Sequence, residues 1–145
     1  MARFRLQRVL GYRRQHEEEC ACTLYQVRLL HRQEAARLEA LQTEAQAQGE
    51  RLEKARGLAL SPAQLQSWQR YHRVLTQRIA AQQDVVTQAA QAVAEQRQQL
   101  LVARQETKVI EKLRDKVQRR ALLALRRREQ HLFDELALMR SRHEL

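Results

Sequence analysis

The sequence predicts an all-α protein in which two long helices form an antiparallel coiled-coil hairpin, the second helix being the longer. Three observations predict this fold class. The chain of 145 residues has one proline and three glycines, and only 4% of its residues are aromatic. Gln, Arg, Ala, Leu and Glu dominate instead, which is typical of long helices and coiled coils. Apolar residues recur at alternating spacings of four and three, and one stop-and-start signal interrupts that pattern.

The first helix is expected over about residues 3–56. Its 4-3 spacing defines a seam of fifteen positions, of which ten are apolar. The members are Leu6, Leu10, Arg13, Glu17, Cys20, Leu24, Val27, His31, Glu34, Leu38, Leu41, Ala45, Gln48, Leu52 and Ala55. We interpret the five polar members as positions where the shaft must also serve partners.

The interruption lies at residues 57–61, which we expect to form the turn. Gly57 can adopt the left-handed conformation that ends many helices. Ser61 is a good N-cap, and Pro62 suits the first position of a helix. Gln64 completes a Ser-x-x-Gln capping box with Ser61.

The second helix is expected over about residues 62–142. Its seam continues the 4-3 spacing as far as Ile110, through Leu65, Trp68, His72, Leu75, Ile79, Gln82, Val86, Ala89, Val93, Gln96, Leu100, Ala103 and Thr107. Beyond Ile110 the seam is expected at Leu113, Val117, Ala121, Leu125, Leu132, Leu136 and Met139. The spacing of three, four and four after Ile110 should relax the left-handed supercoil locally.

A short connection between two long helices makes them antiparallel neighbours. With the turn centred near residue 59, the numbers of two facing residues sum to roughly 118, and roughly 25–30 residues at the end of the second helix extend past the first. We expect residues 1–145 to form a single domain. A two-helix hairpin buries one narrow seam and cannot enclose a substrate pocket, so we expect no enzyme, no small-molecule substrate and no cofactor.

The net charge of +10 is concentrated near the two ends of the chain. Residues 1–14 carry five arginines and no acid, and residues 112–128 carry eight basic residues and one acid. The hairpin places these stretches side by side, which implies an acidic partner surface. The basic residues are Arg3, Arg5, Arg8, Arg13, Arg14, Lys112, Arg114, Lys116, Arg119, Arg120, Arg126, Arg127 and Arg128.

Two other partners would also suit this charge. One alternative is a basic coiled-coil protein that binds nucleic acid. The basic stretch has no aromatic residue for base stacking, so such binding would depend on phosphate contacts and salt. A membrane-surface helix is a weaker alternative, because Phe133 is the only Trp or Phe in residues 110–140. No apolar run approaches the roughly 20 residues that a membrane span needs, so we expect no membrane insertion.

A second apolar line lies beside the seam at the start of the second helix. It consists of Tyr71, Val74, Ala81 and Val85 and is interrupted by Arg78. This line either widens the core or forms a partner-binding face near the turn. His16 and Cys20 have a spacing that two metal ligands could use, but no further ligands accompany them, so we expect no metal site.

Three stretches occur in order along the chain: the opening "FRLQRVLGYRR", the "SPAQLQSWQRYHRVL" that follows the turn, and the ending "KVIEKLRDKVQRRALLALRRREQHLFDELALMR". Through these stretches the whole chain resembles the FliJ family of bacterial flagellar export proteins. The "DELA" within the ending favours the flagellar branch over the equivalent stalk proteins of injectisomes, which remain an alternative.

The resemblance implies a non-enzymatic component of the flagellar type III export apparatus. FliJ-like proteins have an antiparallel coiled coil similar to the γ-subunit stalk of rotary ATP synthases. They lie at the centre of the export ATPase hexamer, promote its assembly, and contact the membrane gate protein and the export chaperones. The implied location is cytoplasmic, peripheral at the cytoplasmic face of the cell membrane. We expect the thirteen basic residues to contact the ATPase, and the line from Tyr71 to Val85 to contact the gate.

Overall fold

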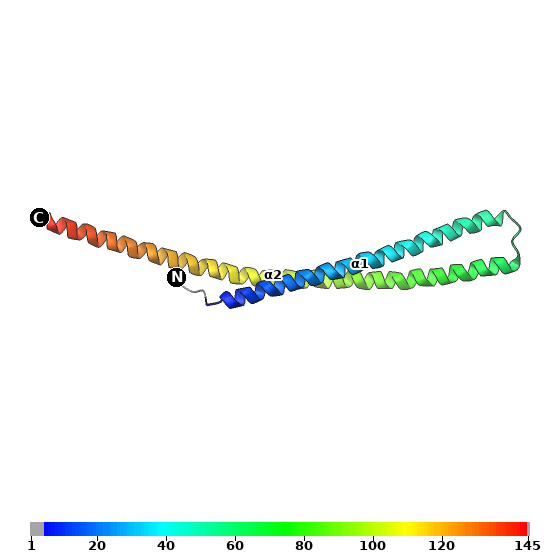
Figure 1. The fold of residues 1–145 in the computed structure, drawn as a ribbon, viewed down its shortest axis with the longest axis horizontal. Helices are drawn as coiled ribbons and strands as arrows, with labels where there is room; N and C mark the ends of the chain where they lie inside the picture. The colour runs from blue at the N-terminus through cyan, green and yellow to red at the C-terminus, as the bar shows by residue number, and fades with distance from the viewer. Residues whose placement is uncertain (1–4, 145) are drawn as a thin grey trace. The chain divides into compact units, whose positions relative to one another are not determined.

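The computed structural model describes residues 5–144 and consists of two helices in these residues. Helix α1 spans Gln7–Arg56 and helix α2 spans Pro62–His143, with 50 and 82 residues (Figure 1). No strand occurs in the described part of the chain. The predicted fold class is confirmed: the protein is all-α, an antiparallel helical hairpin whose second helix is longer. The expected start of the first helix, about residue 3, lies outside the described residues, and Arg5 and Leu6 form a turn.

The capping box at the start of α2 is present as predicted. The backbone N–H of Ser61 donates to Oε1 of Gln64 at 3.1 Å, and the backbone N–H of Gln64 donates to Oγ of Ser61 at 3.3 Å. Two amide donors that the first turn of a helix leaves unpaired are thereby satisfied. This reciprocal pair, with Pro62 as the first helical residue, fixes where α2 begins.

The expectation for Gly57 was wrong. No glycine among the described residues has a positive φ, so α1 does not end through a left-handed residue. Instead, the N–H of Leu58 donates to the carbonyl of Ala55 at 3.0 Å, which closes a tight turn at the helix end. That hydrogen bond satisfies one terminal carbonyl of α1 without left-handed geometry.

The contacts within the chain divide it into two compact units, which are described separately. The turn unit comprises Cys20–Leu100, and the terminal unit comprises Met1–Glu19 with Leu101–Leu145. Each unit contains one section of α1 and one section of α2. The assignment of residues 1–145 to a single domain stays a prediction.

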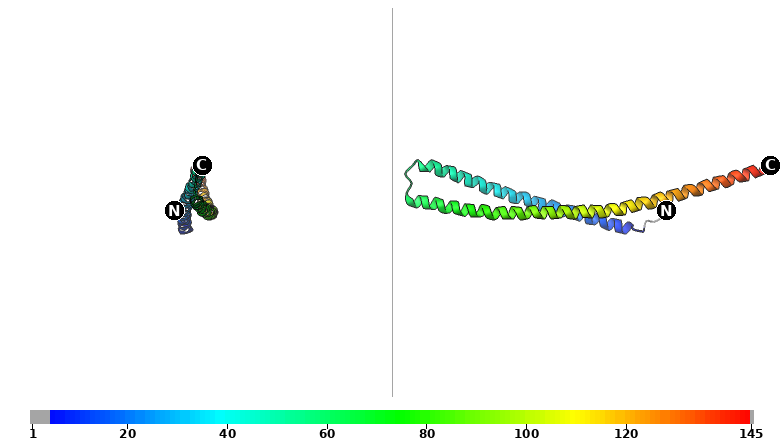
Figure 2. Two further views of the ribbon diagram at one scale, coloured as in Figure 1. Left: turned by 90° about the vertical axis from the view of Figure 1, so that its right-hand side faces the viewer. Right: turned by 180° about the vertical axis from the view of Figure 1, so that it is seen from behind.

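In the turn unit, the buried apolar residues all occupy predicted seam positions. They are Cys20, Leu24, Leu75, Ala89 and Leu100, with Leu75 only 1% exposed. No residue from Ala35 to Val74 is buried, so packing loosens towards the turn. Figure 2 shows the two helices of this unit drawing apart as they approach it.

In the terminal unit, the start of α1 packs on α2 around Leu10, Ala103 and Thr107, all at seam positions and at most 4% exposed. Beyond this contact the expected seam is not covered, because Leu113 and Val117 are 40% and 37% exposed; the section expected to extend past the first helix begins here. Glu111 and Arg114 are half-buried in their place, four residues after Thr107 and Ile110. From Asp115 to Glu144 every residue is exposed, since no part of α1 covers this section of α2.

The seam prediction for α1 is confirmed, because each of its fifteen positions is buried or half-buried. The predicted antiparallel register is also close to the observed one. The side chains of Glu44 and Tyr71, of Glu34 and Gln82, and of Arg13 and Glu106 contact each other, each within three residues of the predicted partner.

Candidate functional site

The strongest concentration of charge lies on α2 in the terminal unit, between Lys112 and Arg128, and is called the basic segment below. Seven of its eight basic residues are exposed. None of these seven forms an ion pair or hydrogen bond with another described residue. They are Lys112, Lys116, Arg119, Arg120, Arg126, Arg127 and Arg128. Their charge is therefore available to an external partner.

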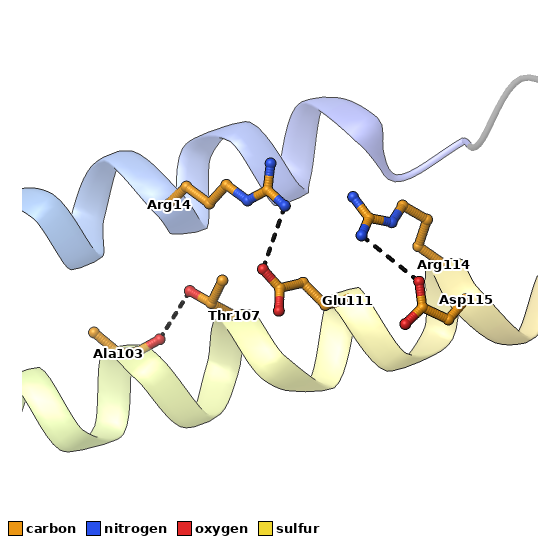
Figure 3. A network of polar contacts seen from close by, with 6 residues as sticks. All are labelled: Arg14, Ala103, Thr107, Glu111, Arg114 and Asp115. Carbon is orange, nitrogen blue, oxygen red and sulfur yellow. Dashed lines mark hydrogen bonds and ion pairs between the residues drawn. The ribbon is translucent and has the colours of Figure 1, made fainter.

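Two basic residues of α1, in contrast, form ion pairs with α2. Nη1 of Arg13 lies 2.6 Å from Oε2 of Glu106, and Nη2 of Arg14 lies 3.3 Å from Oε1 of Glu111. Figure 3 shows Arg14 pointing from α1 towards Glu111 on α2. Arg5 and Arg8 are exposed, and Arg3 lies outside the described residues. The predicted basic cluster therefore divides into residues that hold the helices together and residues that face solvent.

Arg114 belongs to neither group, because its ion-pair partner, Asp115, is the next residue on the same helix. Its side chain is 27% exposed, and Nη2 lies 3.6 Å from Oδ1 of Asp115 (Figure 3). Its Nε is buried and has no hydrogen-bond partner within the described chain. Arg114 marks the end of the packed contact with α1, because it is half-buried and every residue from Asp115 to Glu144 is exposed. From the next helical turn onwards, all residues of the basic segment are exposed to solvent.

Part of the basic segment surrounds a shallow concavity of about 350 Å³ on one face of α2. Its lining residues are Lys112, Asp115, Lys116, Arg119, Arg120 and Leu123. Four cations and one acid leave a net positive surface around an apolar floor residue. Such a surface suits a carboxylate group of a partner, which would receive charge-assisted hydrogen bonds.

The second predicted surface lies in the turn unit and is partly exposed. Tyr71, Val74 and Val85 are 37%, 42% and 41% exposed, and Arg78 and Ala81 are also exposed. These five residues are called the apolar line. The hydroxyl of Tyr71 donates a hydrogen bond to Oε1 of Glu44 on α1. That hydrogen bond, with a smaller contribution from desolvation, raises the pKa of Tyr71 above its ordinary value of 10.0.

Trp68 lies at a predicted seam position, and the sequence reasoning missed the part of its ring that stays exposed. The structure leaves it half-buried, and it lines a shallow depression of about 270 Å³ with Gln48, Ser67 and Tyr71. The depression adjoins the apolar line through Tyr71. The available signal was the short distance of Trp68 from the turn, where a two-helix seam has few neighbours to cover a large ring.

Three polar members of the α1 seam form pairs with other side chains of the hairpin. Glu34 is 9% exposed, and its Oε2 accepts a hydrogen bond of 2.6 Å from the side-chain amide of Gln82. Nη1 of Arg37 lies 2.9 Å from the other carboxylate oxygen. In the terminal unit, Oε1 of Glu17 lies 3.5 Å from Nε of Arg104. Arg13, Glu17 and Glu34 therefore pair within the hairpin, and their service to partners stays a prediction.

Residues 5–144 hold neither a metal site nor a membrane span. No group of three or more His, Cys, Asp or Glu side chains in this range could hold a metal ion. No helix in this range is long and apolar enough to cross a membrane. Cys20 is buried on the seam and Cys22 is exposed.

The fold and the exposed charge define a class: a basic two-helix hairpin in which part of the longer helix is bare. Comparison with models of protein families matches residues 1–145 to the family described as Flagellar FliJ protein. The chain belongs to this family, and the resemblance seen in its sequence is confirmed. The protein is therefore a component of the flagellar export apparatus. Searches of curated proteins and of solved structures gave no match.

Proposed function

We propose that this protein is the non-enzymatic central stalk of the flagellar export ATPase ring. In this role it promotes assembly of the ATPase hexamer and its activity, and ATP chemistry belongs to the partner. It also links the ring to the export gate protein and the export chaperones. The observation that carries the proposal is the basic segment, whose exposed cations have no partner in the described chain.

Electrostatic attraction is better suited than a large apolar contact to hold a stalk in a ring. A stalk has to enter a ring and be held there without one fixed register. Long-range attraction between the basic segment and acidic loops of the ring would steer the helix in and tolerate several orientations. Because an exposed ion pair contributes only about 0–1 kcal/mol, the contact would depend on many weak pairs.

The residues proposed to meet the ring are those of the basic segment together with Arg5 and Arg8. Arg13 and Arg14 stay in the proposed contact region, although their pairs with Glu106 and Glu111 reduce what they can offer a partner. Arg3, which lies outside the described residues, is also proposed to meet the ring. The apolar line is proposed to contact the gate protein, which places the protein in the cytoplasm at the face of the membrane.

Assembly of the ring tests this proposal directly. Purified export ATPase is mixed with the stalk protein and nucleotide after nuclease treatment, and hexamer formation is followed by sedimentation velocity. The test variant changes Arg119, Arg120, Arg126 and Arg127 to Glu. A matched control changes four exposed arginines of the turn unit to Glu: Arg28, Arg70, Arg73 and Arg97.

Both variants have the same net charge, so a nonspecific effect of charge would affect them equally. We expect the wild type and the control to promote hexamers and the test variant to fail. Equal promotion by all three proteins would contradict a role for the basic segment. Equal failure of both variants would show that only total charge matters.

A further inference from the structure

A charged side chain is buried in the seam of the turn unit. Glu34 is 9% exposed and is the one charged residue that is buried among residues 5–144. Its Oε2 accepts a hydrogen bond of 2.6 Å from Nε2 of Gln82, which also donates to the backbone carbonyl of Glu34 at 2.9 Å. Its Oε1 lies 2.9 Å from Nη1 of Arg37. Both carboxylate oxygens therefore have partners, and the partner on the opposite helix is Gln82.

We propose that Glu34 and Gln82, called the polar layer, fix the register in which the two helices of the turn unit pair. A buried carboxylate is costly unless its oxygens accept hydrogen bonds, so the layer favours the register that satisfies it over registers that do not. A polar residue in an apolar seam can specify register in this way at some cost in stability. The inference concerns the turn unit alone and goes beyond the proposed stalk function.

A shift of one heptad is the alternative register that the apolar seam permits, because it again places every seam position against a seam position. Such a shift moves Glu34 and Gln82 away from each other in either direction. Each then meets the residue that lies seven positions before or after its present partner. None of these residues has a side chain that can donate a hydrogen bond, so the carboxylate loses its donor at the opposing seam position. They are Leu75 and Ala89 on α2, and Val27 and Leu41 on α1.

The turn by itself constrains the register weakly. No residue from Ala35 to Val74 is buried, and Figure 2 shows the two helices of the turn unit drawing apart as they approach the connection. The capping box of Ser61 and Gln64 fixes where α2 begins along the chain, but its two hydrogen bonds join neighbouring residues and do not reach α1. A contact between the helices is needed to set their axial offset, and Glu34 is the buried residue of α1 nearest the turn.

The register also determines which side chain of α1 lies beside the apolar line. In the observed register the hydroxyl of Tyr71 donates a hydrogen bond to Glu44. A shift of one heptad would exchange Glu44 for Arg37 or Arg51. The edge of the apolar line would then change from acidic to basic. The polar layer therefore keeps one defined surface on the turn unit, whichever partner binds there.

Distances between two spin labels test the proposal, measured on the full-length chain by pulsed electron paramagnetic resonance. The labels are attached at Arg28→Cys on α1 and Arg70→Cys on α2, which are exposed positions, and the two native cysteines are changed to Ala. A shift of one heptad changes the separation by about 10 Å. We expect one distance with the polar layer intact. Combining Glu34→Leu with Gln82→Leu should add distances about 10 Å longer or shorter.

Urea unfolding followed by circular dichroism gives a second measurement. Gln82→Leu alone should lower the folding equilibrium constant about tenfold or more, because the buried carboxylate loses its donor. Adding Glu34→Leu should recover that loss, because two apolar residues then pack in the seam. The matched control changes Glu39 and Gln83 to Leu, since both are exposed, and it should keep the single distance.

Three results would each overturn the proposal. A single distance in the variant that combines Glu34→Leu with Gln82→Leu would mean that the register is fixed elsewhere. Additional distances in the control would mean that any added leucine has the same effect. A double variant no more stable than Gln82→Leu would mean that the polar layer is an ordinary stabilising contact.

Discussion

Leu100 and Leu101 are adjacent on α2 and have different environments. Leu100 is 6% exposed at a seam position, whereas Leu101 is 49% exposed one residue later. In a hairpin without a third layer, a side chain is buried only where the opposite helix covers it. The contribution of a leucine to stability therefore depends on its seam position rather than on its hydrophobicity.

This difference gives a prediction for unfolding. Leu100→Ala should lower the free energy of unfolding by about 2–3 kcal/mol, because it removes buried methyl groups and leaves a cavity at the seam. Leu101→Ala should change it by about 0.5 kcal/mol or less. Urea unfolding followed by circular dichroism measures both. Similar losses in the two variants would mean that burial does not follow the seam.

Tyr71 gives a second prediction at this scale. The hydrogen bond to the Glu44 carboxylate requires the protonated phenol, so it raises the pKa of Tyr71. Because the pKa is raised on folding, the stability from this bond is complete below pH 10 and is lost as the pH rises through the raised pKa. Glu44→Gln should lower the pKa of Tyr71 towards 10.0.

Absorbance titration measures this change, with Tyr71→Phe identifying the signal of Tyr71 among the three tyrosines. If Glu44→Gln leaves the midpoint unchanged, the hydrogen bond does not persist in solution.

At the scale of elements, the 4-3 spacing was sufficient to predict the buried face of α1 and that of α2 from Leu75 to Ile110, whereas the predicted seam positions Leu65 and His72 are exposed. Capping chemistry was sufficient to predict the start of α2. The polar seam positions could not be interpreted from one helix alone. Glu34 resembles a break in the seam until Gln82 is seen opposite it, and the same holds for Arg13 and Glu106. Pairing across helices depends on the register to within a residue, and the register was predicted only to within three residues.

The location of the candidate site was predictable from the sequence, but the pairing of its individual residues was not. The sequence located the basic segment, because its charge is local along one helix. The sequence could not show that Arg14 is paired and Arg114 half-buried while Arg119 and Arg120 face solvent. This difference depends on where the contact with α1 ends. The partial exposure of Trp68 was also not predicted, and it follows from the loose packing near the turn.

The apolar line gives a prediction at the scale of one helix face. Val74→Asp with Val85→Asp should weaken binding to the export gate protein several-fold while leaving the helical signal unchanged, because both side chains are more than 40% exposed. Val102→Asp is a suitable control, since Val102 is 43% exposed and lies outside the line. Binding is measured by surface plasmon resonance and helicity by circular dichroism. A large loss of helicity in the double variant would assign these residues to the core.

At the scale of the molecule, the net charge of +10 favours a partner with an acidic surface. Much of the charge that is free for a partner lies on the exposed part of α2. If many weak ion pairs hold the stalk in the ring, the wild-type stalk should stimulate ATP hydrolysis less as the salt concentration rises from roughly 0.1 to 0.5 M. An apolar contact would show little dependence on salt over this range.

The rate of ATP hydrolysis by the export ATPase is the most direct test of the stalk function. It is measured with no stalk, with the wild type, with the variant carrying Glu at Arg119, Arg120, Arg126 and Arg127, and with the control carrying Glu at Arg28, Arg70, Arg73 and Arg97. We predict that the wild type and the control stimulate hydrolysis and that the variant of the basic segment loses most of this stimulation. Equal stimulation by all three proteins would contradict the account and leave the basic segment a solvated helix face.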